Sequence, residues 1–481
     1  MSKDIGITVK KSEDFSEWYN QVVLKAELAD YASAKGFMVL RPYGYQIWEI
    51  IQSVLDREFK RLGVRNAYFP ALIPESILKR EAEHFKGFVP EVFWVTEAGD
   101  NKLNERLAVR PTSETIAYSS YSKWIRSWRD LPLLLNFWNS VMRAEIKSTK
   151  PFIRTSEFLW QEGHTAHATK EEADKMVLTI LNLYKWFIEE YLAIPVLAGC
   201  KTEREKFVGA LYTTTLEAIM PDGKALQMGT SHNLGQNFSK VFEIKYLGQD
   251  KQEHYVWQTS WGVSWRLIGA VIMVHGDDKG LILPPKIAPI QVIVIPIFYK
   301  DKPNEELASK AKDLTALLTE NGVRAYCDDR EEYTPGWKFN EWELRGVPLR
   351  LEIGPRDLEN RTVTFALRDT SERVVVEEGA VVEKAKELLD VLQTRLKKRA
   401  EAMFRELCST IESYEEFKQI LASKGGFIKA GWCGDQTCEV SIKEETGADI
   451  RVVPFEADSS LKKCVYCGRE AKITAYFAKA Y

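Results

Sequence analysis

The sequence predicts three consecutive domains. These are a large α+β domain on a mostly antiparallel sheet (residues 1–283), an α/β domain (284–400) and a small α/β zinc-binding domain (401–481). Three observations predict this order. Helical repeats alternate with aromatic-rich runs in the first part of the chain. A proline-rich break at 283–289 precedes regular strand–helix alternation. Four cysteines then follow in two short pairs near the end of the sequence.

The large domain is predicted from three helical patterns and four short strands. Apolar residues recur with helical spacing over 15–35, 47–63 and 171–191. Gly63 suits the end of the second helix, and Thr169 with Glu172 forms a capping box at the start of the third. Runs at 67–69, 93–96, 133–140 and 158–162 alternate and are rich in aromatic residues. We therefore expect a mostly antiparallel sheet.

The second domain shows a different rhythm. Strands are predicted at 292–297, 323–327 and 349–353, and helices at 304–321 and 336–344. Such alternation favours a parallel or mixed sheet. A charged helix over 382–407 then leads to the cysteine-bearing segment.

Composition indicates an ordinary globular protein with 45% hydrophobic residues, 28% charged residues and a formal net charge of -3. No overall positive field indicates nucleic acid, although a local basic face can still bind RNA. The longest apolar run, 290–299, is too short to cross a bilayer and predicts a buried strand. The polar start lacks the apolar core of a signal peptide, so we expect a cytoplasmic protein with no membrane partner.

The cysteine pairs predict a metal site. Cys433 and Cys438 are separated by four residues, and Cys464 and Cys467 by two. Two such knuckles suit tetrahedral zinc, with two disulfides or four buried thiols as the alternatives. Four thiolates leave no ligand position for water, so the zinc is expected to be structural and the chemistry to lie elsewhere.

One candidate for that chemistry is the segment 140–145 with the later segment 154–158. Arg143 and Glu145 share one face of a strand, where the guanidinium can bind a phosphate and a carboxylate. Glu145 can accept from an adenine amino group, Phe158 offers a stacking face, and Arg154 adds a phosphate contact. The alternative is an exposed Arg–Glu pair on a sheet.

A second candidate is Arg266, which interrupts the apolar segment 262–270. A buried arginine is costly without a partner. The side chain therefore either pairs with a structural carboxylate or faces a cleft and binds an anion.

Together these segments resemble motifs 2 and 3 of the class II aminoacyl-tRNA synthetases. The helix from Ile47 and the strand ending at Pro70 resemble motif 1. Segments 110–114, 160–164 and 229–232 further resemble the prolyl-tRNA synthetases over essentially the whole chain. The cysteines and Tyr481 resemble the archaeal and eukaryotic type, in which the C-terminus folds back toward the catalytic domain.

The resemblance implies a homodimeric ligase with the class II synthetase fold. It implies activation of L-proline with ATP and Mg²⁺, and transfer of proline to tRNA(Pro). Arg143 and Arg266 are the implied catalytic residues, on the α- and γ-phosphates. The implied ATP-binding residues are Arg143, Glu145, Arg154, Thr155, Phe158, Gln227, Thr230, Ser264 and Arg266. The implied proline-binding residues are Thr112, Glu114, Arg143, Trp160, Glu162, His164 and His232. Outside the resemblance, the histidines are also compatible with a core role, and residues 112–114 with a helix cap.

Residues 289–398 resemble a class IIa anticodon-binding domain. Its candidate RNA contacts are Lys338, Arg345, Arg356 and Arg368, with Trp337 and Phe339 as stacking surfaces. Each of these is equally compatible with a solvated or core position.

The resemblance also predicts an absence. Too few residues separate His164 from Gly262 for the editing insertion that many bacterial-type relatives carry. We therefore expect activation of alanine or cysteine without hydrolysis in cis. The alternative functions are a class IIa synthetase for threonine, serine or glycine, and a non-catalytic synthetase-like RNA-binding protein.

Overall fold

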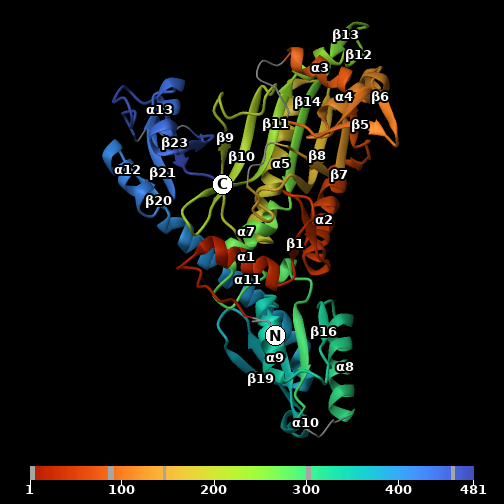
Figure 1. Ribbon diagram of the computed structural model, residues 1–481, viewed down its shortest axis with the longest axis vertical. Helices are drawn as coiled ribbons and strands as arrows, with labels where there is room; N and C mark the ends of the chain where they lie inside the picture. The colour runs from red at the N-terminus through yellow and green to blue at the C-terminus, as the bar shows by residue number, and fades with distance from the viewer. Residues whose placement is uncertain (1–5, 85–90, 145–147, 299–304, 457–460) are drawn as a thin grey trace.

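The computed structural model describes residues 6–84, 91–144, 148–298, 305–456 and 461–481. Figure 1 shows the large domain with its central sheet, the second domain below it, and the small domain beside the sheet. The long helix α11 (Val381–Glu406) runs between the second and third domains. No helix in the described ranges is long and apolar enough to cross a membrane.

The large domain is built on a seven-stranded sheet in the order β3-β7-β8-β14-β11-β10-β9. All neighbours are antiparallel except β3 and β7, which confirms the expected mostly antiparallel sheet. Its strands are β3 (Arg65–Asn66), β7 (Leu133–Met142), β8 (Glu157–His167), β9 (Leu197–Cys200), β10 (Tyr212–Ile219), β11 (Ala225–Gly235) and β14 (Trp257–Ser264).

One face of this sheet carries the main core. The helices α2 (Pro42–Arg61), α5 (Lys170–Glu190) and α7 (Arg266–His275) pack there in one apolar cluster that includes Phe59, Tyr184 and Trp261. The predicted second and third helices are thus confirmed. The capping box is present, since Thr169 Oγ1 accepts from the Glu172 amide at 3.2 Å and the Glu172 carboxylate accepts from the Thr169 amide at 3.4 Å.

The predicted helix over 15–35 is wrong in its second half. The helix α1 (Phe15–Lys25) ends early and is followed by a hairpin of β1 (Ala29–Tyr31) and β2 (Met38–Leu40). Glu27 has a φ of 58°, a left-handed conformation that stops the helix. The predicted strand at 67–69 is also absent, because pairing with β7 ends at Asn66.

The opposite face of the sheet is only partly covered. The helices α4 (Glu114–Trp124) and α6 (Asn237–Val241) cover one end of it, where Tyr118, Phe137 and Phe238 are buried together. Beside them lie a three-stranded sheet and a short hairpin. The sheet comprises β4 (Leu72–Pro74), β5 (Trp94–Ala98) and β6 (Asn101–Val109), and the hairpin comprises β12 (Lys245–Leu247) and β13 (Glu253–Tyr255). The helix α3 (Glu75–His84) follows β4.

The second domain is the expected α/β layer. Its sheet has the order β16-β15-β17-β18-β19, with β15 parallel to β16 and β17 and the remaining pairs antiparallel. Its elements are β15 (Val292–Pro296), α8 (Glu305–Glu320), β16 (Ala325–Cys327), α9 (Pro335–Leu344), β17 (Leu349–Ile353), α10 (Pro355–Asn360), β18 (Thr362–Leu367) and β19 (Arg373–Glu377). The proline-rich break holds a short 3-10 helix, Pro285–Ile287.

The third domain is a four-stranded sheet in the order β20-β21-β23-β22 with two helices. Its elements are β20 (Cys408–Thr410), α12 (Tyr414–Ala422), β21 (Phe427–Trp432), α13 (Gln436–Thr446), β22 (Asp449–Val452) and β23 (Ile473–Ala478). Its sheet is joined to the large one, because Cys200 and Val453 exchange backbone hydrogen bonds of 2.7 and 2.9 Å. The domain limits at 283 and 400 stay predictions, and residue 400 lies inside α11.

Candidate active site

Twelve residues predicted from sequence line one cavity of about 260 Å³ on the partly covered face of the large sheet. They are Thr112, Glu114, Arg143, Phe158, Trp160, Glu162, His164, Gln227, Thr230, His232, Ser264 and Arg266. Residues 112 and 264 are far apart in sequence, so the strand order brings them together.

Strand register explains the convergence. Glu162 on β8 lies opposite Gly262 on β14, which in turn lies opposite Thr230 on β11. One step along, His164, Ser260 and His232 form the next row. Residues two apart on a strand share a face, so both rows belong to the same floor. Gly262 has no side chain, which leaves the middle of the first row open.

Arg143 stands immediately after β7. Its guanidinium lies over two aromatic rings, 5.3 Å from the centroid of Phe158 and 5.8 Å from that of Trp160. Its Nε donates to the carbonyl of Pro111 at 3.2 Å. The stacking and the backbone bond fix the plane of a group that can bind phosphate or carboxylate bidentately.

Arg266 is the first residue of α7 and reaches the same cavity. Its Nη1 and Nη2 donate to the carbonyls of Gln227 and Ile153, both at 3.4 Å, and its Nε has no partner in the described part of the chain. Burial and then the nearby charge of Arg143 lower its pKa to about 10. Of the two alternatives, the structure favours an arginine that faces the cavity and can bind an anion there.

A second cavity of about 430 Å³ adjoins the first and shares Arg143, Phe158, Ser264 and Arg266 with it. It brings in the predicted residues Arg154 and Thr155. Glu145 lies outside the described residues. Together the two cavities are lined by three arginines, which suits a polyphosphate.

Tyr481 also lines this second cavity, as the C-terminal fold-back predicts. Its hydroxyl donates to Asp222 at 2.6 Å, and Lys150 Nζ lies 4.8 Å from its ring centroid. The preceding residues pair with the start of β11, since the Ala225 amide donates to the Lys479 carbonyl at 2.7 Å.

The far end of the first cavity holds a carboxylate–imidazole network. Glu162 accepts from the Ser113 hydroxyl, from the Ser113 amide at 3.1 Å, from Asn139 Nδ2 at 2.9 Å and from His164 Nε2 at 3.0 Å. Thr112 donates to Glu114, and Tyr118 contacts His164 Nδ1 at 3.1 Å. Metal-ligand atoms of Glu114, Glu162 and His164 lie within 4.8 Å of one another, but Glu162 is already satisfied. An ammonium with two donors therefore fits better than a metal.

The pKa values of the two histidines of this cavity shift in opposite directions. Burial opposes protonation of His164, but the carboxylates of Glu114 and Glu162 outweigh it and raise its pKa. Burial likewise opposes ionisation of Glu162, but hydrogen bonds led by His164 hold its pKa below the ordinary value. For His232, burial and then the charge of His164 lower the pKa to about 3. His232 is thus a neutral partner, 2.9 Å from Thr213 Oγ1.

Sequence reasoning missed the loop between β9 and β10. Glu205 and Phe207 line the cavity, and the Phe207 ring centroid lies 4.9 Å from that of His232. Thr202, near the start of this loop, donates to Glu439 of the third domain at 2.8 Å. No motif marks these residues, because their role depends on packing between distant segments.

Three of the four predicted basic residues of the second domain are already bonded within the protein. Lys338 is buried and donates to the Asp328 carbonyl at 3.0 Å. Arg368 is buried and forms a bidentate pair with Asp277 at 2.7 and 2.9 Å. Arg345 pairs with Glu27 and Glu341, whereas Arg356 is exposed at the start of α10. Exposed Tyr333 stacks on half-buried Trp337, with ring centroids 3.9 Å apart.

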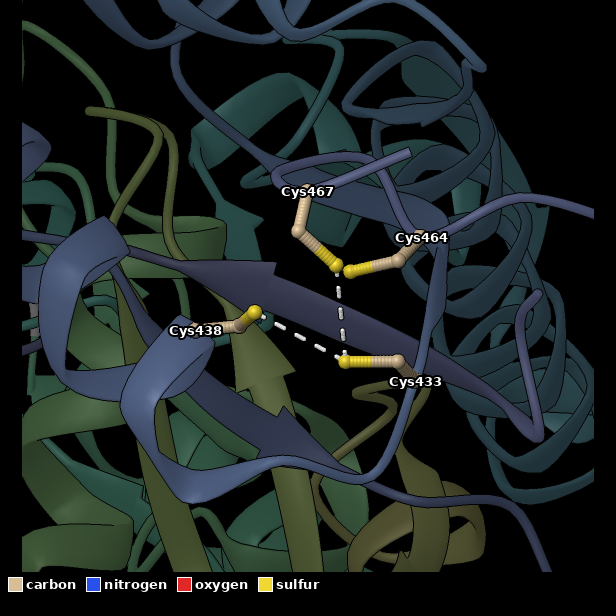
Figure 2. A group of neighbouring side chains, drawn as sticks. All are labelled: Cys433, Cys438, Cys464 and Cys467. Atoms are coloured by element: carbon tan, nitrogen blue, oxygen red, sulfur yellow. Dashed lines mark hydrogen bonds between the residues drawn. The ribbon is translucent and has the colours of Figure 1, made fainter. Parts of the chain in front are cut away.

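The four predicted cysteines do converge. Figure 2 shows their sulfurs turned toward one another, and Cys433 Sγ lies 3.6 Å from Cys438 Sγ and 3.8 Å from Cys467 Sγ. A tetrahedron with Zn–S bonds of about 2.3 Å has edges of about 3.8 Å. A hydrogen bond from Arg469, with Nε 3.3 Å from Cys467 Sγ, lowers the pKa of Cys467 to about 6. The cluster can hold a metal, and none of the four cysteines is in a disulfide.

Three family models match the chain. A tRNA synthetase class II core domain (G, H, P, S and T) matches residues 93–275, an anticodon binding domain matches 291–388, and a prolyl-tRNA synthetase C-terminal domain matches 414–481.

Similar proteins span the whole chain. A proline–tRNA ligase of Cenarchaeum symbiosum (strain A) is 58% identical over 478 residues, covering 99% of this chain and 100% of that protein. One of Natranaerobius thermophilus is 54% identical over 473 residues, covering 98% and 97%. A crystal structure of prolyl-tRNA synthetase from Cryptosporidium parvum, complexed with halofuginone and AMPPNP, superposes with a TM-score of 0.95 at 44% identity over 100% of both chains.

Proposed function

Because the chain belongs to the prolyl-tRNA synthetase family, we propose that its two adjoining cavities form one active site for attaching proline to tRNA(Pro). The observation that carries this proposal is the placement of Arg143 and Arg266. Both guanidiniums line the space that joins the cavities, and the carboxylate–imidazole network lies at one end of it. The polyphosphate and the amino acid thus have separate ends and a common meeting point.

The first step follows from this arrangement. A carboxylate oxygen of proline attacks the α-phosphorus of ATP, the bond to the β-phosphate oxygen breaks, and pyrophosphate leaves. Arg143 holds the α-phosphate and the proline carboxylate in line, and Arg266 meets the negative charge of the γ-phosphate. The protein contributes orientation and electrostatic stabilisation, without a nucleophile of its own. A terminal ribose hydroxyl of the tRNA then takes the prolyl group and AMP leaves.

Recognition of proline rests on charge at the other end. The secondary ammonium of proline is cationic and carries two N–H donors. The Glu114 carboxylate and the Thr112 hydroxyl are placed to accept them, while His164 stays paired with Glu162. Neutral His232 and the Phe207 ring supply a less polar wall for the pyrrolidine ring.

The test is amino-acid-dependent ATP–pyrophosphate exchange, with proline set against threonine, serine, glycine, alanine and cysteine. We expect the strongest exchange with proline, and its loss in Arg143→Ala. Exchange strongest with threonine, serine or glycine would indicate another class IIa specificity. A folded protein with no exchange, with or without tRNA, would indicate a non-catalytic tRNA-binding protein, a role that both arginines argue against.

Weak activation of alanine and cysteine is also part of the proposal. The cavity is small, but removing one or two methylene groups from a ligand costs only about 1–3 kcal/mol each. Adenylate formation should therefore be measurable with alanine or cysteine at high concentration. Undetectable adenylate with both amino acids contradicts this part of the proposal alone.

Two metals complete the proposal. The cysteine cluster would hold a structural Zn²⁺, supported by sulfur separations of 3.6 and 3.8 Å. When bound, zinc ties two distant segments of the third domain together. Mg²⁺ would accompany ATP, and Gln227 and Thr230 offer the oxygen atoms that this hard cation prefers. Elemental analysis of the purified protein, and the dependence of exchange on Mg²⁺, test these assignments.

We further propose a cytoplasmic homodimer that binds the tRNA anticodon with its second domain. Exposed apolar side chains gather near β3, β4 and the end of α4: Tyr68, Leu72, Trp124 and Trp128. Such a group supports a subunit interface close to motif 1. Exposed Arg356 and the Tyr333–Trp337 stack support the RNA contact. Light scattering and tRNA-binding measurements test these two assignments.

A further inference from the structure

A fully buried carboxylate lies directly behind the nucleotide end of the cavity. Glu217 on β10 is 0% exposed and does not line the cavity itself. It lies opposite Gln227 in the register of β10 and β11, next to a register shift between Leu216 and Glu217. A buried carboxylate is costly unless cations and hydrogen bonds surround it. The residues that bond Glu217 therefore determine how firmly this part of the sheet is fixed.

One of its partners comes from the third domain. Arg451 on β22 grips both carboxylate oxygens, with Nη2 at 3.0 and 3.1 Å and Nε at 3.2 Å. Lys201 Nζ donates to Glu217 Oε1 at 2.7 Å and to the Arg451 carbonyl at 3.0 Å. The three side chains are at most 11% exposed. Lys201 alone would neutralise Glu217, so Arg451 adds a net positive charge.

From Glu217 the contacts continue to the active site. Thr215 Oγ1 donates to Glu217 Oε1 at 3.2 Å, and Gln227 Nε2 donates to Thr215 Oγ1 at 3.4 Å. The Gln227 carbonyl in turn accepts from Arg266. A short chain of contacts thus runs from Arg451 to the arginine assigned to the γ-phosphate.

We propose that Arg451 is a positioning residue of the third domain, which orders Gln227 and Arg266 for ATP by fixing Glu217. The proposal rests on the function proposed above. It assigns ATP binding, rather than proline binding, to this contact between domains. Arg451 touches neither substrate and acts only through the Glu217–Thr215–Gln227 contacts and through its charge.

The backbone around this contact supports a fixed distance between β9 of the large domain and the sheet of the third domain. The sheet of the third domain joins β9 through Val453, two residues after Arg451. A Cβ on Gly199 would come within 2.3 Å of the Val453 carbonyl oxygen, so a residue without a side chain is needed there. The two sheets are therefore held close at the point where Arg451 enters.

The experiment compares Arg451→Met and Arg451→Lys in the full-length protein. We expect Arg451→Met to raise the KM for ATP and the Kd of a non-hydrolysable ATP analogue about tenfold, with the KM for proline changed less than about twofold. Arg451→Lys keeps the charge and should recover part of the ATP affinity. The matched control is Arg395→Met, which removes an arginine from another buried carboxylate, that of Asp369, in the second domain. It should leave the KM for ATP unchanged.

A double-mutant cycle then tests the route. If Arg451 acts through Glu217, Arg451→Met should add little to the ATP defect of Glu217→Gln. Additive effects, an unchanged KM for ATP, or equal increases for ATP and proline would each overturn the proposal. Wild-type protein without proline-dependent exchange would instead refute the proposed function. Calorimetric binding of the ATP analogue would still show whether Arg451 affects the nucleotide site.

Discussion

The cavity of the large domain and the second domain differ in how the structure places the residues predicted from sequence. In the cavity, twelve residues chosen from short motifs line one space of about 260 Å³. In the second domain, two of the four basic residues expected to contact RNA, Lys338 and Arg368, are buried. The difference is physical. Strand register forces alternate residues of neighbouring strands onto one face, whereas an arginine serves equally well in an ion pair or on RNA.

The comparison is tested most strongly at the two cavity arginines. We expect Arg143→Ala and Arg266→Ala each to lower the kcat of proline-dependent exchange by about a hundredfold to a thousandfold, as when one preorganised charge is removed from a transition state. Arg143→Lys should recover little, because an ammonium cannot bind bidentately. Arg395→Met is the control for the general effect of removing an arginine away from the cavity. Near-normal exchange in either alanine variant would place the chemistry elsewhere.

We expect the next largest effect from the cysteine cluster, which lies outside the cavity but includes Cys438, the neighbour of the Glu439 that binds Thr202. Removing zinc with a chelator, or by Cys438→Ser, should make Glu439 mobile and so weaken its hydrogen bond with Thr202, near the start of the loop between β9 and β10. We expect exchange to fall about tenfold and to return on adding Zn²⁺ to the chelated wild type. Cys408→Ser, outside the cluster, should keep its zinc and its activity. Full activity of the zinc-free protein would mean that the cavity does not depend on the metal site of the third domain.

Much of the fold could be predicted from local pattern, and the failures have local causes. The capping box at Thr169 and the apolar repeat of α2 are strong local signals, and both were confirmed. The pattern over 15–35 continued past the true end of α1, because a left-handed Glu27 carries no clear sequence signal. Phe207 and Arg451 could not be found at all, since their partners are distant in sequence.

The prediction of RNA contacts in the second domain can be made more precise by comparing an exposed arginine with a buried one. Arg356→Ala should raise the KM for tRNA(Pro) several-fold, by about 1 kcal/mol, and leave exchange without tRNA unchanged. Arg368→Met should instead lower the free energy of unfolding by about 1–3 kcal/mol, because Asp277 loses its bidentate partner. Aminoacylation kinetics and urea unfolding distinguish the two. A defect in Arg368→Met that is confined to tRNA would instead support Arg368 as an RNA contact.

The smallest expected effect contrasts the two cavity histidines through pH. The pKa of His164 is raised in the folded protein, so its stabilisation is complete below the ordinary value of about 6.5 and is lost as pH rises through the raised pKa. The pKa of His232 is lowered to about 3, so its neutral form costs stability only as pH falls below about 6.5. As pH rises above about 6.5, the unfolding free energy of wild type minus that of His164→Gln should therefore fall. The same difference for His232→Gln should stay flat, because neither the folded nor the unfolded state takes up a proton there. Equal slopes for the two histidines would mean that His164 is neutral in the cavity, and that Glu162 is held by its hydrogen bonds from Ser113 and Asn139 alone.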